Sequence, residues 1–141
     1  LDEAQAVFDR TLGTDPDLWE AHFGLGIVAR QRADGRAAER AFRRVLELWP
    51  DQPDALHELG VALLMRDARQ AALEALERAA ALRPDDAAYI ADAGFAHLRA
   101  GDLATARRQL ERAARLDAAD PITRSYLEEL GRAEAGAGGT S

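Results

Sequence analysis

One spacing recurs throughout this chain of 141 residues and constrains its fold more than any other feature. Pro16, Pro50 and Pro84 follow one another at intervals of 34 residues. The same step separates four further sets of similar residues: Gly26, Gly60 and Gly94; Ala4, Ala38, Ala72 and Ala106; Phe8, Phe42, Leu76 and Leu110; and Leu25, Leu59, Ala93 and Leu127. Five sets with one period indicate that the chain is built from repeated units of this length.

Each unit carries the spacing of two amphipathic helices. Small and apolar residues recur at intervals of three and four over residues 53–66 and again over 69–82, which gathers them on one helix face. They are Leu56, Leu59, Gly60 and Leu63 in the first stretch and Ala72, Leu76, Ala79 and Ala80 in the second. The recurring glycine stands where the paired helices must approach closely, since a larger side chain would push their axes apart.

Glycine, aspartate and proline punctuate the units. We expect Gly35 and Gly101 to supply the left-handed φ of the turn between paired helices, because glycine adopts it at little cost. Pro50 and Pro84 end the second helix of their units, since proline removes an amide donor and clashes with the preceding turn. The third unit has Ala118 at this place, so we expect that junction to be slightly irregular.

The period and the residue types at these places resemble the tetratricopeptide repeat family. The resemblance covers nearly the whole chain and implies an all-α fold, a right-handed superhelical array of antiparallel helix pairs with about eight helices. It implies one domain over residues 1–135, followed by a Gly-rich stretch, 136–141, that we expect to be a flexible tail. The implied parts of the domain are a half repeat at 1–18, full repeats at 19–52, 53–86 and 87–120, and a capping helix at 121–135.

The same resemblance implies where a partner would bind. In this family the first helices of successive units line a concave groove, and six positions of each unit face it. Carried over position by position, the candidate partner-binding residues are Phe23, Ile27, Arg30, His57, Val61, Leu64, Met65, Phe95, Leu98 and Arg99. An apolar strip with charged ends suits an apolar peptide or an amphipathic helix. The strip could instead serve packing between units, and the sequence leaves that choice open.

Composition excludes several classes of function. The formal net charge of −7 argues against nucleic acid and against docking on an anionic membrane by charge. The chain has no cysteine, and its apolar stretches are too short to insert in a bilayer. Some relatives bind the carboxylate of a chaperone tail with Lys and Asn, and this chain contains neither residue. All of its basic residues are Arg, which we interpret as the codon bias of a GC-rich, bacterial genome.

No pattern predicts catalysis, a metal site or a cofactor. His22, His57 and His97 match no local metal-ligand spacing, and only His57 would face the groove, as a contact or a pH-sensing residue. Gly24-Leu25-Gly26 lacks the preceding strand of a dinucleotide site. No nucleophile and base stand in a recognisable pair. We therefore expect a non-enzymatic chain that uses no cofactor.

The sequence thus favours a scaffold that binds a protein or peptide partner. One alternative is a homo-oligomer formed through the open face of the first helix, between Leu1 and Leu12, or through the groove. Another is a regulatory or recruiting arm of a larger enzyme whose catalytic domain lies elsewhere. The chain opens on Leu1 with half a unit, so we expect it to be part of a longer protein. The compartment is unknown, with the cytoplasm favoured.

Overall fold

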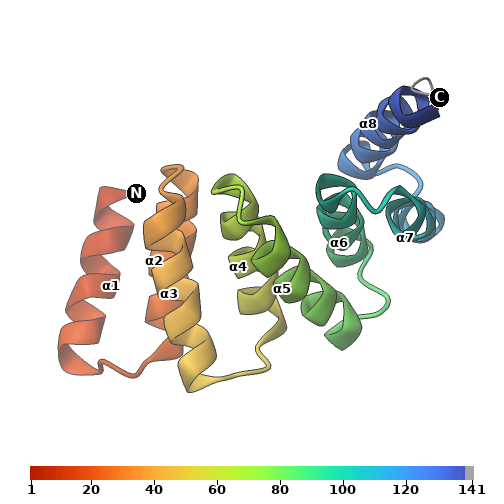
Figure 1. The fold of residues 1–141 in the computed structure, drawn as a ribbon. Helices are drawn as coiled ribbons and strands as arrows, with labels where there is room; N and C mark the ends of the chain where they lie inside the picture. Colours follow the sequence, from red (N-terminus) through yellow and green to blue (C-terminus); the bar gives the residue numbers. More distant parts are fainter. Residues whose placement is uncertain (139–141) are drawn as a thin grey trace.

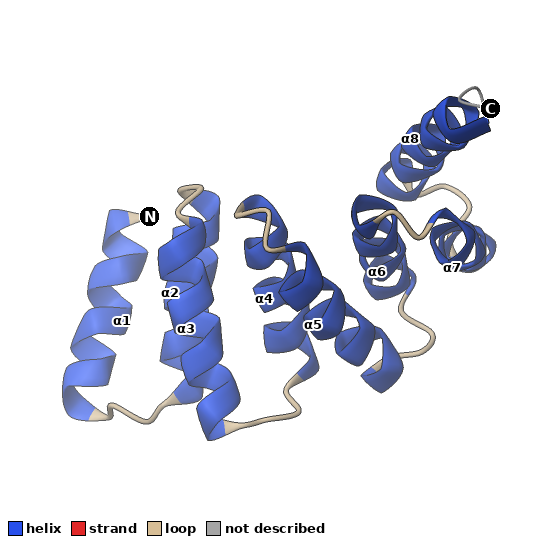
Figure 2. Cartoon of the chain, in the orientation of Figure 1, coloured by secondary structure: helices blue, strands red, loops and turns tan. Residues whose placement is uncertain are grey.

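A computed structural model describes residues 1–138, and within them the chain forms eight helices and no strand (Figure 2). The helices follow one another as a single array, with α1 and α8 at its opposite ends (Figure 1). Their bounds are α1 (Asp2–Thr14), α2 (Trp19–Gln31), α3 (Gly35–Leu48), α4 (Pro53–Met65), α5 (Arg69–Leu82), α6 (Ala87–Ala100), α7 (Leu103–Leu116) and α8 (Pro121–Gly138). The predicted all-α repeat array is therefore confirmed.

A small residue opposite a large one sets the distance between the two helices of each full unit. A Cβ atom placed on Gly60 would lie 2.4 Å from Cγ of Leu76, far inside van der Waals contact. The large member of each pair is fully buried. The three pairs are Gly26 with Phe42, Gly60 with Leu76, and Gly94 with Leu110. The recurring glycine therefore creates the close approach that the sequence predicts.

The turn inside each full unit places one residue in the left-handed conformation. These residues are Ala33 with φ 59°, Asp67 with φ 57° and Gly101 with φ 89°, and they recur at the repeat period. The expectation of a left-handed Gly35 is wrong, because Gly35 is already the first residue of α3. Only the third unit places a glycine where the backbone requires positive φ. The other two units bear the cost of a side chain in that conformation.

The junctions between units are all of the same kind, including the one expected to be irregular. The N–H of Asp117 donates to the carbonyl of Ala113 at 2.9 Å, as Trp49 does to Val45 at 2.8 Å. Asp120 then caps α8, accepting hydrogen bonds from the backbone N–H and the hydroxyl of Thr123. The junctions are residues 15–18, 49–52, 83–86 and 117–120. Proline is thus not needed to shape this turn, and the prediction of an irregular third junction is wrong.

A second periodic feature links neighbouring units, and it escaped the sequence analysis. A residue near the start of a second helix contacts one near the end of the next unit's first helix, 27 positions later. Arg107 holds Glu134 with two hydrogen bonds of 2.6 Å. Pairs of this kind are Gln5 with Arg32, Glu39 with Arg66, and Arg107 with Glu134. Because α8 takes part in this ladder, it stands in register as the first helix of a further unit.

The carboxyl-terminal helix is longer than expected. α8 continues to Gly138, so residues 136–138 of the expected flexible tail are helical. Residues 139–141 of that tail lie outside the described part of the chain. Over the described range, no helix is both long enough and apolar enough to cross a membrane.

Candidate functional site

The first helices of the units and α8 together line a groove with a volume of about 580 Å³. Every residue of its lining lies on α2, α4, α6 or α8, and none lies on a second helix of a unit. The lining consists of Arg30, His57, Glu58, Val61, Leu64, Met65, Ala88, Asp92, Phe95, Arg99, Ile122 and Tyr126. Seven of the ten candidate partner-binding residues therefore come together: Arg30, His57, Val61, Leu64, Met65, Phe95 and Arg99.

The remaining three candidates are engaged in packing. Phe23 and Ile27 lie against a core cluster that includes Phe42, and the rings of Phe23 and Phe42 meet edge to face at 5.5 Å. Leu98 is only 8% exposed and belongs to a core cluster with Leu110. Leu98 is therefore buried by packing, whereas Phe23 and Ile27 pack against the core and remain half-buried.

The apolar part of the groove has exposed side chains on two helices. Met65 at the end of α4 is 43% exposed, and Ile122 at the start of α8 is 55% exposed. Between them the ring of Phe95 stacks on that of Tyr126, with centroids 4.3 Å apart. Neither Ile122 nor Tyr126 was among the candidate residues of the sequence analysis, although both occupy groove-facing positions when the residues from 121 onward are numbered as a further unit.

Polar side chains join the helices beneath this apolar surface. Nε2 of His57 lies 2.5 Å from the Asp92 carboxylate, whose other oxygen accepts a hydrogen bond of 2.9 Å from the Tyr126 hydroxyl. The His57 ring also stacks on Tyr89, and the Tyr89 hydroxyl donates to Asp54. Asp92 thereby links α4, α6 and α8, so these contacts hold the helices that carry the groove in a fixed arrangement.

Burial and neighbouring carboxylates shift several pKa values in and beside the groove. Burial raises the pKa of the Tyr89 and Tyr126 phenols well above the usual range, and the acidic groups that accept their hydrogen bonds raise it further. Burial likewise raises the pKa of Glu58, although Arg30 lies 2.6 Å away and opposes the shift. The groove therefore favours the neutral forms of these side chains.

Arg99 adds a further positive charge to the groove. Its guanidinium lies 5.6 Å from the centroid of the Phe95 ring, a cation–π contact. Within residues 1–138 it forms no ion pair with a carboxylate. The groove thus offers an apolar surface with one unpaired cation at the carboxyl-terminal end of α6, an arrangement suited to binding.

Comparisons with known proteins agree with this architecture. The structure superposes on MamA with a TM-score of 0.85 at 22% sequence identity, covering 95% of this chain and 73% of MamA. For the first repeat domain of Spaghetti (RPAP3) bound to the HSP90 peptide SRMEEVD, the TM-score is 0.77 at 16% identity, covering 83% and 93%. For the Sgt2 domain from Aspergillus fumigatus it is 0.78 at 19% identity, covering 85% and 81%.

At these identities the likeness concerns the fold. No curated protein sequence matches the chain. A sequence model of the tetratricopeptide repeat family, however, matches residues 1–34 and 25–87, more than half of the chain. With the 34-residue period and the paired helices, this match shows that the chain belongs to the tetratricopeptide repeat family.

Proposed function

We propose that this chain is a protein-interaction module that binds an apolar peptide, or one face of an amphipathic helix, in the groove between α4, α6 and α8. The observation that carries the proposal is the exposure of Met65 and Ile122 on two helices of one groove. Exposed apolar side chains that gather in one groove are typical of a binding surface, whereas those scattered singly over a protein surface need no such explanation. Burying such surface contributes roughly 25 cal/mol per Å² before ordering costs are subtracted.

The extent of the groove along α6 suits a short segment of a partner. Ala88 and Arg99 both line it and lie on α6, eleven residues apart, which at 1.5 Å per residue is about 16 Å. That length accommodates about three turns of helix or five residues of extended peptide. The guanidinium of Arg99, which forms no ion pair within the described residues, would favour a partner with an acidic residue beside its apolar stretch.

A structural neighbour supports peptide binding without naming the partner. The RPAP3 domain of the same fold is bound to an HSP90 peptide. The present chain contains neither Lys nor Asn, so a carboxylate clamp built from those residues is not available to it. We therefore propose a partner that is recognised mainly through apolar side chains.

Peptide selection against the purified chain tests this proposal. A random peptide library would be panned on the protein, and the enriched peptides would be measured against Met65→Glu and Leu82→Glu. Leu82 is the matched control, because it is 41% exposed and does not line the groove. We expect enriched peptides to be apolar, to lose affinity about tenfold or more with Met65→Glu and to keep it with Leu82→Glu. Equal binding to both variants would disprove the groove as the site.

Self-association is a second candidate, favoured by the amino-terminal helix. Val7 of α1 is 49% exposed, and Leu1, which precedes this helix, is 55% exposed. Phe8, which occupies the same repeat position as Phe42, packs against Gly24 of the following unit. Light scattering coupled to size exclusion distinguishes the candidates. A dimer that Val7→Glu dissociates would support self-association through α1, whereas a monomer over the accessible concentration range would remove this candidate.

A further inference from the structure

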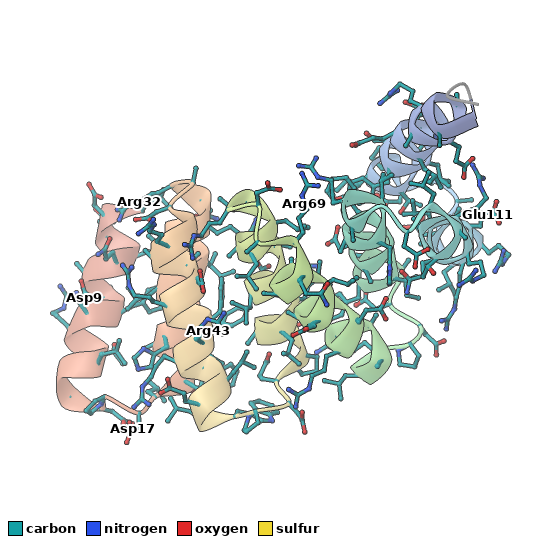
Figure 3. All side chains as sticks on the ribbon, in the orientation of Figure 1. Asp9, Asp17, Arg32, Arg43, Arg69 and Glu111 are labelled. Carbon is teal, nitrogen blue, oxygen red and sulfur yellow. The ribbon has the colours of Figure 1, made fainter. Side chains whose placement is uncertain are left out.

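A second cavity, of about 390 Å³, lies between α1 and α3, with α2 as its floor. It does not open into the groove. Val28 lines this cavity and Arg30 lines the groove, and the step of two residues from one to the other turns the helix by about 200°. The two hollows therefore lie on opposite sides of α2. Asp9 on α1 and Arg32 after α2 belong to the cavity lining and are labelled in Figure 3.

The cavity exists because one repeat position carries a small side chain in the first unit. Ala29 lies on its floor. The same position is Leu63 in the second unit, where the side chain is almost fully buried. In the third unit it is His97, whose ring is held by Glu77. The space that a leucine or a histidine fills in the later units is left open in the first.

The walls of the cavity carry three arginines in a chain that is acidic overall. Arg32 is bound to Gln5 and Asp2, and Arg44 forms ion pairs of 2.7 Å with Asp17 and Glu47. The third, Arg40, is exposed. Within the described residues it forms no ion pair or hydrogen bond, which leaves its guanidinium available to a ligand.

The lining contains two acidic residues, and one of them is already hydrogen-bonded within the chain. The carboxylate of Asp34 accepts the backbone N–H of Ala37 at 3.0 Å and so caps α3. Asp9 is the remaining carboxylate of the lining, and its negative charge would repel an anion. The floor is apolar, with Leu25 and Val28 beside the small Ala29. The cavity thus combines an apolar floor with an unpaired cation on its wall.

We propose that this cavity binds a small organic anion, with its acidic group at Arg40 and its apolar body on the floor formed by Val28 and Ala29. The volume falls within the range of about 300–1,000 Å³ that is usual for small-molecule sites. An anionic group suits a guanidinium that has no internal partner. The site is separate from the proposed peptide groove and does not depend on it.

Fluorescence titration with anilinonaphthalene sulfonate tests the proposal, since this aromatic anion brightens in an apolar site. N-phenylnaphthylamine, which has the same rings without the charge, is the matched neutral probe. We expect the sulfonate to bind the native chain at one saturable site, about tenfold more tightly than the neutral probe. Ala29→Leu should abolish this binding, because it places in the cavity the side chain that the second unit carries as Leu63.

Charge variants provide the second arm of the test. Arg40→Gln should weaken sulfonate binding about tenfold, and Asp9→Asn should strengthen it, with the neutral probe unchanged in both. Both residues are exposed, so these variants test the proposal even if Ala29→Leu fails to fold. Circular dichroism would verify folding. Sulfonate binding that is absent, that survives both Ala29→Leu and Arg40→Gln, or that is lost in the groove variant Met65→Glu would overturn the proposal.

Discussion

Replacing Gly60 by alanine should destabilise the chain, although alanine is the better helix former. The added methyl group would lie 2.4 Å from Cγ and 2.6 Å from Cδ2 of Leu76. Carbon atoms in good contact are about 3.5–4.0 Å apart, so either the leucine or the whole of α5 must move by about 1 Å. Leu76 is fully buried, so its side chain has no free space to enter.

The net magnitude follows from two opposing effects. Inserting a methyl group in a packed core costs about 1–3 kcal/mol. The change from glycine to alanine inside a helix recovers about 1 kcal/mol. We therefore expect the free energy of unfolding to fall by about 1 kcal/mol, and by no more than about 2 kcal/mol, for Gly60→Ala, and the midpoint of thermal unfolding to fall by up to roughly 10 °C.

A matched glycine without neighbours should give the opposite sign. Gly131 lies in α8, is exposed, and has no atom within 4 Å of the position that a Cβ would take. Gly131→Ala should therefore stabilise the helix by up to about 1 kcal/mol. The change in stability for Gly94→Ala should lie between those for Gly60→Ala and Gly131→Ala, since its Cβ would lie 2.9 Å from Cγ of Leu110.

Urea unfolding followed by helical circular dichroism measures the three variants. Because units of a repeat array can unfold separately, hydrogen exchange of the α8 amides should accompany it for Gly131→Ala. The reasoning fails if Gly60→Ala is as stable as the native chain, since Leu76 would then relax at no cost. It fails equally if Gly131→Ala is destabilised.

Two further predictions concern the intra-unit turn and the tyrosines. Ala33→Gly should raise stability by about 0.5–1 kcal/mol and Gly101→Ala should lower it by a similar amount, because both positions have positive φ; thermal unfolding measures both, and a loss with Ala33→Gly would contradict this. Tyr89 and Tyr126 have a pKa raised above the ordinary value of about 10, so the stability they contribute is complete below that pH and is lost as the pH rises toward the folded-state pKa. Ultraviolet absorbance should show both phenols neutral above pH 10 until the chain unfolds, and tyrosinate forming in the folded chain with an ordinary midpoint would refute this.

The helices were predictable because packing imposes the repeat on residue types. A glycine must stand wherever a buried leucine or phenylalanine approaches a first helix, as Gly60 does opposite Leu76, so the pattern is visible in the sequence. The backbone conformation of a turn constrains residue type less strongly than packing in the core does. Ala33 and Asp67 adopt a left-handed φ that alanine and aspartate only tolerate, while Gly35 lies in a helix. Residue type alone therefore misplaced the turn in the first unit.

Exposure in the groove was less predictable, because it depends on the neighbour of each unit. Leu64 and Leu98 occupy the same repeat position, one period apart. Leu64 lines the groove, whereas Leu98 is buried in the cluster that contains Leu130 of α8. Identical positions therefore differ in exposure, since α8 packs against α6 and covers part of the third unit. Because the two residues share a repeat position, the sequence analysis listed both as candidates.

The ladder of contacts between units also records their order. Glu39 of α3 faces Arg66, whereas Arg107 of α7 faces Glu134, so the acid and the base exchange places along the array. If α3 packed against α8 in place of α4, the carboxylates of Glu39 and Glu134 would meet. The guanidiniums of Arg66 and Arg107 would then face each other. Each exposed pair contributes only about 0.2–1 kcal/mol, yet in the wrong pairing this attraction becomes repulsion. Exchange of neighbours between units with similar cores, a failure to which repeat proteins are prone, is thereby made less favourable.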